Sequence, residues 1–333
     1  MSDFRQRLET FLTARNQPLS VEQLTPDAST REYFRVRWND DSAIACVYPE
    51  PFAASEQTYL DATNLFLQGG LPVAKIYDFD ENSGVIVLED FGDRVLRDVL
   101  LQSDDARRER LLNEAIKLIA EIQATTARAF AARSMASRLK FDEEKLLWEL
   151  NFFKTHYFET FRKTHLSETE DAALTAEFTT LAVDLESRAD VLCHRDFHAA
   201  NLMLDRENRL RIIDHQDARI GSATYDLVSL LLDRVLQTPD VDWLAAKKHF
   251  FLNEREKLGL TAIDFSEFES EFRLQTVQRC LKAVGTFSFQ SVVRGKTYFI
   301  PFIKPMFRIV LQACEDLKKF PHLREIVHVE IES

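Results

Sequence analysis

The feature that most constrains the fold of this 333-residue chain is a pair of short apolar runs separated by a polar turn. The runs cover residues 202–204 and 210–213, and the turn between them begins Asp205-Arg-Glu-Asn. Two apolar runs that flank such a turn predict a β-hairpin. We therefore expect the side chains just outside the two runs to meet at the open end of this hairpin.

Two oxygen-bearing side chains are predicted at that open end. A turn centred near Glu207 places Leu202 across from Ile213. The same register places Asn201 across from Asp214. Mg²⁺ prefers oxygen ligands and commonly takes one or two protein carboxylates beside the phosphate groups of a substrate. Asn201 and Asp214 are therefore the predicted magnesium ligands.

The loop that enters the hairpin carries a candidate catalytic base. Asp196 stands five residues before Asn201, where it can accept a proton from a hydroxyl group placed beside the metal. His194, Asp196, Asn201 and Asp214 follow one another in the order of a kinase catalytic loop. Asp and Asn are also common turn residues. Four elements in this order, on a hairpin that brings them together, favour the kinase interpretation.

Several longer segments resemble one family of kinases. They are Cys193-His-Arg-Asp-Phe-His-Ala-Ala-Asn-Leu-Met, Ile212-Ile-Asp-His-Gln-Asp, Tyr225-Asp-Leu-Val-Ser-Leu, Asp27-Ala-Ser-Thr-Arg-Glu-Tyr-Phe-Arg and Val277-Gln-Arg-Cys-Leu-Lys-Ala-Val-Gly-Thr-Phe. With them the chain resembles the aminoglycoside phosphotransferase-like small-molecule kinases. It is most similar to the bacterial kinases of cell-wall recycling, which phosphorylate N-acetylmuramate and N-acetylglucosamine at the anomeric hydroxyl.

The resemblance implies an α+β, two-lobed, protein-kinase-like fold with a small β-rich N-terminal lobe and a larger helical C-terminal lobe. The expected boundaries are 1–88 for the nucleotide-binding lobe, 89–92 for a hinge, and 93–333 for the helical lobe with the hairpin and the substrate site. The chain's own pattern agrees, because predicted strand pairs come first and helical periodicity follows. Backbone groups of Glu89 and Phe91 in the hinge are expected to face the adenine of ATP.

The loop before the first predicted strand is the candidate phosphate-binding loop. Ser29 and Thr30 can offer hydroxyl and backbone N–H groups to phosphate oxygens, and Arg31 can offer charge. Kinases also use a strand lysine to hold the α- and β-phosphates. The corresponding strand here, residues 43–48, contains no lysine. We assign that role to Arg31, with Arg35 as the second candidate.

Four residues are predicted to face the sugar on the strength of the resemblance. Glu149 lies in a segment similar to one of the sugar kinases and can receive sugar hydroxyl groups, although a solvated helix face is an equal alternative. Gln278, Arg279 and Lys282 fall within one helical turn. The two cations suit the lactyl carboxylate of a muramyl sugar. An ordinary basic surface helix is the alternative.

Three further polar residues lie close to the hairpin in the sequence. His198 occupies the position where protein kinases carry a lysine, and we group it with the substrate residues. Asp217 either leans towards the metal or the substrate or serves as a turn residue. Asp226 is expected to be structural, as a helix cap or as a buried acceptor for groups of the catalytic loop.

Composition excludes several classes of protein. A net charge of −12 and an isoelectric point near 5.3 argue against nucleic-acid binding, which needs clustered cations. No signal peptide or membrane span is expected. The four scattered cysteines indicate buried free thiols and a reducing compartment. We therefore expect a cytoplasmic protein without a membrane partner, acting as a monomer on a small-molecule sugar.

The predicted reaction is ATP- and Mg²⁺-dependent phosphorylation of an amino sugar at its anomeric hydroxyl. Another alcohol, such as an aminoglycoside or choline, is the nearest alternative, but the cations of the Gln278–Lys282 segment suit an anionic acceptor. The missing lysine raises a second alternative, a nucleotide-binding pseudokinase that regulates a partner. Retention of Asp196, Asn201 and Asp214 argues against it. A zinc site built from histidines has little support, because no cysteine or second histidine pair accompanies them.

Overall fold

The computed structural model describes residues 3–24 and 30–332. The chain divides into two compact units. The first unit comprises residues 1–107 and 199–217, and the second comprises residues 108–198 and 218–333. The predicted division had assigned the hairpin to the helical lobe, whereas by its contacts the hairpin belongs to the first unit. The hinge at 89–92 stays a prediction.

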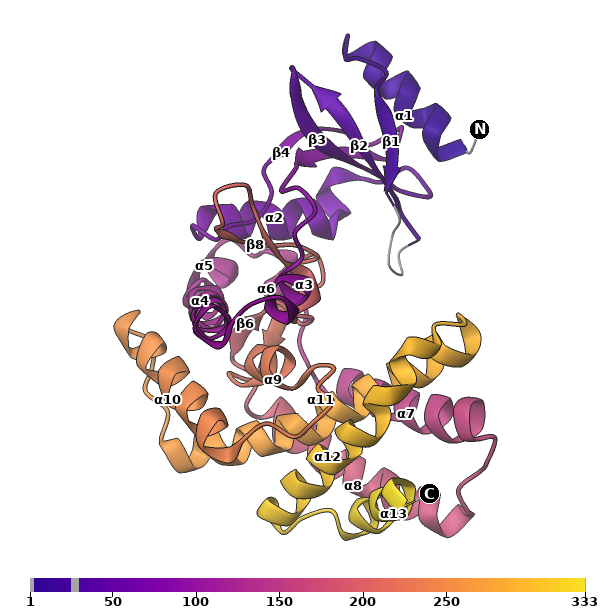
Figure 1. Cartoon of the computed structure of the whole chain (residues 1–333), viewed down its shortest axis with the longest axis vertical. Coiled ribbons are helices and arrows are strands. Elements are labelled where there is room, and N and C mark those ends of the chain that lie inside the picture. The colour runs from indigo at the N-terminus through magenta and orange to yellow at the C-terminus, as the bar shows by residue number, and fades with distance from the viewer. Residues whose placement is uncertain (1–2, 25–29, 333) are drawn as a thin grey trace. The chain divides into compact units, whose positions relative to one another are not determined.

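The first unit is built on a five-stranded antiparallel sheet in the order β1-β2-β3-β5-β4, with a separate two-stranded hairpin (Figure 1). Its elements are α1 (Asp3–Ala14), β1 (Val21–Leu24), β2 (Glu32–Trp38), β3 (Asp41–Val47), η1 (Ala54–Glu56), α2 (Thr58–Gln68), β4 (Ile76–Asp80), β5 (Val85–Glu89), α3 (Leu96–Leu101), η3 (Ala199–Asn201), β7 (Leu202–Leu204) and β8 (Leu210–Ile212). Strand β1 was not predicted, because its four residues are too few to show an alternating pattern.

One face of the sheet forms an apolar core with α1. Alternate residues of β2 are buried there, namely Phe34, Val36 and Trp38, as expected for a strand with one covered face. They pack with Leu8 and Phe11 of α1. The opposite alternation points Arg35 away from this core, which leaves its guanidinium available to other polar groups.

The second unit is mainly helical. Its elements are α4 (Asp105–Ala124, mostly in this unit), α5 (Thr126–Ala131), α6 (Met135–Arg138), α7 (Glu143–Lys154), the π-helix η2 (Thr155–Arg162), α8 (Glu168–Glu186), β6 (Val191–Cys193), β9 (Arg219–Gly221), α9 (Tyr225–Leu232), α10 (Val241–Lys257), α11 (Phe265–Val293), η4 (Thr297–Phe302), α12 (Ile303–Leu317) and α13 (Pro321–Glu332). Strands β6 and β9 pair antiparallel. Among residues 3–24 and 30–332, no helix combines the length and the apolar composition needed to cross a bilayer.

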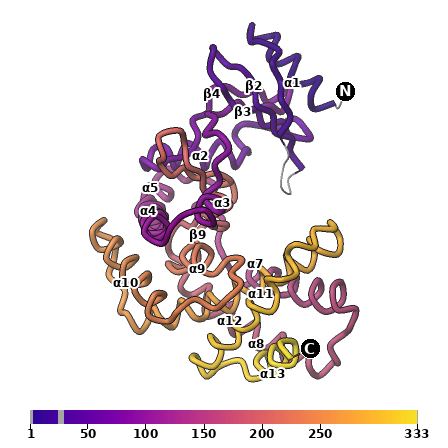
Figure 2. The backbone as a smooth tube through the Cα atoms, viewed as in Figure 1, coloured from indigo at the N-terminus to yellow at the C-terminus, as the bar shows by residue number. Residues whose placement is uncertain are grey.

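Helix α11 runs through the middle of the second unit and contacts α7, α9 and α12 (Figure 2). Its approach to α7 is close at Gly285. A Cβ atom at this position would lie 2.7 Å from Phe153 Cα and 3.0 Å from Phe153 N. Because real Cβ atoms do not come that near to backbone, the absence of a side chain at residue 285 permits the observed helix contact.

Candidate active site

The hairpin of the first unit pairs one residue away from the predicted register. Leu202 lies opposite Ile212, not opposite Ile213. The Ile213 N–H donates to the Asn201 carbonyl at 3.1 Å, so these two residues face each other and Asp214 lies one residue beyond. The predicted pairing of Asn201 with Asp214 is therefore wrong. Both residues still stand at the open end of the hairpin.

The turn of the hairpin explains the register. The Asp205 carboxylate accepts hydrogen bonds from the backbone N–H groups of Glu207 at 2.9 Å and Arg209 at 3.0 Å. Asn208 adopts the left-handed conformation, with φ 62°, which asparagine tolerates better than most residues. The turn therefore comprises residues 205–209 and is centred on Glu207, and with this centre Leu202 faces Ile212.

Asp214 has an exposed carboxylate in an uncommon backbone conformation. Its side chain is 45% exposed, and its φ is 63°. Oδ1 accepts a hydrogen bond from Gln216 Nε2 at 2.9 Å and lies 3.7 Å from Arg31 Nη2. Asn201 is half-buried at the end of η3. An amide oxygen and a carboxylate at one end of a hairpin fit the oxygen preference of magnesium.

A magnesium ion at this hairpin would need further ligands. In the described part of the chain, no three or more His, Cys, Asp or Glu residues gather in a metal-binding group. Mg²⁺ normally completes its shell with waters and substrate phosphates, so Asn201 and Asp214 are a sufficient protein contribution. The same finding gives no support to the alternative of a histidine zinc site.

Arg31 lies against the strand that lacks a lysine. Its guanidinium is 5.5 Å from the ring centroid of Tyr48, its Nη1 is 3.4 Å from the Tyr48 hydroxyl, and its side chain is 15% exposed. Arg35, the second candidate, forms ion pairs with Asp90 at 2.8 Å and Asp93 at 2.7 Å. This geometry favours Arg31 for phosphate binding, because Arg35 is engaged beside the hinge.

Thr30 and Ser29 are the other two residues of the candidate phosphate loop. Thr30 is exposed in a bend next to Arg31. Ser29 lies outside the described residues. The loop therefore remains a prediction, supported by the position of Arg31 at its end.

The predicted hinge is tied to strand β8 of the hairpin. The Glu89 carboxylate forms an ion pair with Arg211 at 2.7 Å, and the Arg211 guanidinium lies 4.4 Å from the ring centroid of Phe91. The Glu89 N–H donates to the Lys75 carbonyl at 2.9 Å. The Glu89 N–H is therefore engaged within the sheet, and contact of Glu89 and Phe91 with an adenine stays a prediction. A cavity of about 190 Å³ adjoins this segment, lined in part by Ser42, Glu89, Phe91 and Arg211.

Three apolar residues beside the hinge were not predicted as site residues. Ile44, Met203 and Ile213 are partly buried and pack against a cluster that includes Leu88 and Phe91. Partly exposed apolar side chains next to a hinge are suited to the faces of an adenine ring. The sequence showed them as members of strands, and no signal distinguished them from ordinary core residues.

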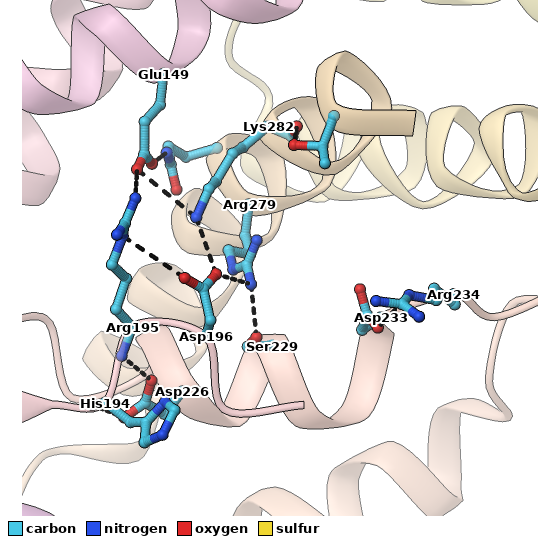
Figure 3. A network of polar contacts seen from close by, with 12 residues as sticks. Glu149, His194, Arg195, Asp196, Asp226, Ser229, Asp233, Arg234, Arg279 and Lys282 are labelled. Carbon is cyan, nitrogen blue, oxygen red and sulfur yellow. Dashed lines mark hydrogen bonds and ion pairs between the residues drawn. The ribbon is translucent and has the colours of Figure 1, made fainter. Parts of the chain in front are cut away.

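In the second unit, Asp226 holds the loop that carries Asp196 (Figure 3). Its buried carboxylate accepts the His194 N–H at 2.7 Å and the Arg195 N–H at 3.0 Å. Burial raises the pKa of Asp226. Arg195 has φ 85°, a strained conformation that these two hydrogen bonds help to maintain. The expected structural role of Asp226 as a buried acceptor is confirmed.

Asp196 lies among three cations (Figure 3). Its Oδ1 is 3.1 Å from Arg279 Nη2 and 3.2 Å from Lys282 Nζ, and its Oδ2 is 3.7 Å from Arg195 Nε. Burial alone would raise the pKa of Asp196, but Lys282, Arg279 and Arg195 outweigh burial and hold this pKa well below its ordinary value. The carboxylate is therefore ionised at neutral pH and able to accept a hydrogen bond from a hydroxyl group.

Glu149 supports the same cations from α7. Its side chain is fully buried, accepts a hydrogen bond from Gln278 Nε2 at 2.8 Å, and lies 3.7 Å from Lys282 Nζ and 4.0 Å from Arg195 Nη2. Burial opposes its ionisation, but these cations, Lys282 first, lower its pKa. The alternative of a solvated helix face is wrong for Glu149.

The Gln278–Lys282 segment is also not a surface helix. Gln278 is fully buried and its Oε1 accepts a hydrogen bond from Gln275 at 2.9 Å. The side chains of Arg279 and Lys282 are almost as buried, with 9% and 12% exposed. Glu149 and Gln278 therefore suit the positioning of cations better than direct contact with a sugar, and Arg279 and Lys282 remain the predicted sugar-facing residues.

His198 and Asp217 lie in different units. His198 is half-buried in the second unit, and its N–H donates to the Asp196 carbonyl at 3.0 Å. Burial lowers its pKa, so the imidazole is neutral at pH 7. Asp217 is half-buried at the end of the hairpin segment of the first unit. Contact of either residue with a substrate stays a prediction.

The carboxylates of Glu149 and Asp196 carry a pH-dependent share of the stability. Their pKa values in the folded chain are below the ordinary 4.5 and 3.8, so the unfolded chain binds more protons in acid. This stability is fully present above the ordinary values and is lost as the pH falls through the folded-state values. We expect the free energy of unfolding, measured with urea from about pH 6 to about pH 3, to fall less steeply in Glu149→Gln. Equal pH slopes of the unfolding free energy in the wild type and in Glu149→Gln would contradict a lowered pKa of Glu149.

The chain is similar in sequence to one protein family and to named sugar kinases. Residues 20–260 match the model of the phosphotransferase enzyme family. The N-acetylmuramate/N-acetylglucosamine kinase of Neisseria meningitidis serogroup B is 30% identical over 279 residues, which are 83% of this chain and 80% of that protein. The protein of the same name from Pseudomonas aeruginosa is 27% identical over 317 residues, 93% of this chain and 88% of that protein.

Solved structures agree on the fold. A putative aminoglycoside phosphotransferase from Ralstonia eutropha superposes with a TM-score of 0.64 at 16% identity, covering 96% of this chain and 98% of that one. Choline kinase LicA from Streptococcus pneumoniae superposes with a TM-score of 0.59 at 14% identity, covering 93% of this chain and 100% of that one. The predicted two-lobed kinase-like fold class is confirmed.

Proposed function

The chain belongs to the phosphotransferase enzyme family, and on that premise we propose that it transfers the γ-phosphoryl group of ATP to the anomeric hydroxyl of N-acetylmuramate or N-acetylglucosamine. The observation that carries the proposal is the ionised Asp196 beside Arg279 and Lys282. It provides a proton acceptor next to two cations, which suits a sugar hydroxyl and a nearby anionic group. The names of the curated relatives support the choice of acceptor.

Asp196 is proposed to act as the general base. Its carboxylate accepts a hydrogen bond from the anomeric hydroxyl and takes the proton as the new oxygen–phosphorus bond forms and the bond to ADP breaks. An anomeric hydroxyl is more acidic than an ordinary alcohol, so its proton is transferred to a carboxylate more easily. Asp226 contributes by holding the loop on which Asp196 stands.

The nucleotide is proposed to bind to the first unit. The Glu89 carbonyl and the Phe91 backbone would face the adenine edge, while Ile44, Met203 and Ile213 would cover its faces. Ser29, Thr30 and Arg31 would bind the phosphates, as the sequence predicts. Asn201 and Asp214 would hold Mg²⁺, which when bound neutralises charge on the phosphates.

Arg279 and Lys282 are proposed to recognise the carboxylate of N-acetylmuramate. Four cations surround the two carboxylates of Glu149 and Asp196, which leaves a surplus of positive charge; they are Arg195, Arg279, Lys282 and Lys145, whose Nζ lies 3.9 Å from Glu149. An acceptor carboxylate would balance this charge. It would also draw Lys282 from Asp196 and leave the base free to meet the hydroxyl. A neutral sugar offers no such exchange.

The first experiment is ³¹P NMR of the protein with MgATP and each sugar, with kanamycin and choline as alternative acceptors. A sugar 1-phosphate signal is the expected result. Phosphorylation of choline or kanamycin alone would replace the sugar assignment with another alcohol. Nucleotide binding with no product from any acceptor would favour the pseudokinase alternative, which the lysine-free strand β3 keeps open.

The specificity proposal is tested with Lys282→Gln. We expect kcat/KM for N-acetylmuramate to fall about 10- to 100-fold, because a hydrogen bond to a charged group is lost. The value for N-acetylglucosamine should fall much less. Lys304→Gln, an exposed lysine on α12, serves as the matched control. Equal losses for the two sugars would show that Lys282 does not read the carboxylate.

We also propose a cytoplasmic location, where ATP is available. All four cysteines are buried and free, which suits a reducing compartment. A monomeric state is proposed alongside it, and size-exclusion chromatography with light scattering tests that state.

A further inference from the structure

His215, the residue directly after Asp214, packs against one face of helix α2. Its fully buried ring lies 5.0 Å from the Tyr59 ring and 5.3 Å from the Phe66 ring, measured between centroids. Its Nε2 lies 2.7 Å from the hydroxyl oxygen of Thr63. Positions 59, 63 and 66 are four and three residues apart, so they share one face of the helix.

The bond between Thr63 and His215 is short, and both side chains are fully buried. Either group can be the donor, depending on the tautomer of the ring. A buried polar atom that loses its partner is costly, so the two groups hold each other in one arrangement. The aromatic rings on both sides of the contact further restrict the imidazole. The backbone at residue 215 is thereby fixed relative to α2.

The neighbouring Asp214 needs such support. Its φ of 63° lies in the left-handed region, which costs an aspartate free energy unless the surroundings enforce it. Its own side chain is 45% exposed, and Gln216 and Arg31 contact its carboxylate rather than its backbone. The buried ring of the next residue is the anchor that the structure offers.

We propose that Thr63 is a positioning residue, which through His215 holds Asp214 in the conformation that binds the metal. In protein kinases an ion pair between a strand lysine and a helix glutamate joins the strand to the helix. Strand β3 has no lysine. The Thr63–His215 hydrogen bond supplies a different link between helix and metal loop. The inference rests on the proposed function, in which Asp214 is a magnesium ligand.

The test compares Thr63→Val, which keeps the shape of the side chain, with Thr63→Ser, which keeps the hydroxyl. Binding of Mn²⁺ in the presence of ADP is followed by electron paramagnetic resonance, and binding of ADP without metal by calorimetry. We expect Thr63→Val to weaken Mn²⁺ binding about tenfold, the loss of one buried hydrogen bond. Metal-free ADP binding should stay the same, and Thr63→Ser should restore Mn²⁺ binding.

A double-mutant cycle with His215→Phe identifies the partner. The phenylalanine keeps an aromatic ring between Tyr59 and Phe66 but cannot bond to Thr63. The effects of Thr63→Val and His215→Phe on Mn²⁺ binding should therefore not add. Tyr59→Phe is the control for the Tyr59 hydroxyl, which also bonds to Thr63, and it should leave Mn²⁺ binding unchanged.

Three results would overturn the inference. Wild-type Mn²⁺ affinity in Thr63→Val would remove the role of the hydroxyl, and additive effects in the cycle would remove His215 as its partner. An equal loss of metal-free ADP binding would show a general defect of the first unit. Failure of the wild-type protein to bind Mn²⁺ with ADP is distinguishable from these, because it would overturn the metal site of the proposed function itself.

Discussion

Replacing Asp196 with asparagine is expected to lower kcat for sugar phosphorylation by about 10²- to 10⁴-fold, the usual contribution of a general base. Asparagine has the same shape and can still accept a hydrogen bond from Lys282, but it cannot take the proton of the acceptor hydroxyl. The affinity for ATP should change little, because the proposed nucleotide contacts lie on other residues. Coupled measurement of ADP release and ³¹P NMR of the sugar phosphate give the two readouts.

Asp242→Asn is the matched control for this substitution. Asp242 is an exposed aspartate in the first turn of α10, so the loss of its charge is not expected to affect catalysis. It should retain the wild-type kcat. If Asp196→Asn also retained it, Asp196 would not be the base, and another group would have to accept the proton.

Glu149→Gln is expected to destabilise the protein by about 3 kcal/mol, the lower end of the range for removing one partner of a buried ion pair. Glutamine keeps the volume and can still bond to Gln278. It leaves Lys282 and Arg195 without the buried negative charge that faces them from α7. Urea unfolding monitored by circular dichroism at pH 7 measures the difference.

The double variant Glu149→Gln with Lys282→Met separates charge from packing. Removing the cation as well should recover at least about 1 kcal/mol of the lost stability, because fewer buried charges are left uncompensated. A single variant as stable as the wild type would mean that Glu149 is not needed to compensate these cations. A double variant less stable than the sum of the singles would point to packing as the cause.

The candidate residues close in sequence to the hairpin could be named from the sequence, and their roles stay predictions. Asp196, Asn201 and Asp214 have a fixed spacing that a kinase requires, and Asp226 follows at a distance that a cap or loop acceptor would need. The turn is centred on Glu207, as predicted, but with that centre Leu202 pairs with Ile212, so the predicted register was one residue out. The Asp205 side chain bonds to two backbone N–H groups and stabilises this turn of residues 205–209, a contact that apolar patterning does not reveal.

The buried network of the second unit could not be predicted from local pattern. In α7 an amphipathic interpretation buries Trp148 and exposes Glu149, but the structure leaves Trp148 55% exposed and buries Glu149. The reversal depends on Gln278 and Lys282, which come from a helix about 130 positions along the chain. A buried carboxylate is favourable only when such partners compensate its charge, and the sequence around Glu149 does not indicate that they are present.

The absence of a side chain at Gly285 affects the buried network around Glu149. Phe153, against which Gly285 packs, is one turn from Glu149 along α7, and Gly285 is two turns from Gln278 along α11. The separation of these helices therefore sets whether Glu149 can reach Gln278 at 2.8 Å. The buried Glu149–Gln278 pair, and with it the charge that faces Lys282 and Arg195, therefore depends on a helix contact made by neither residue of the pair.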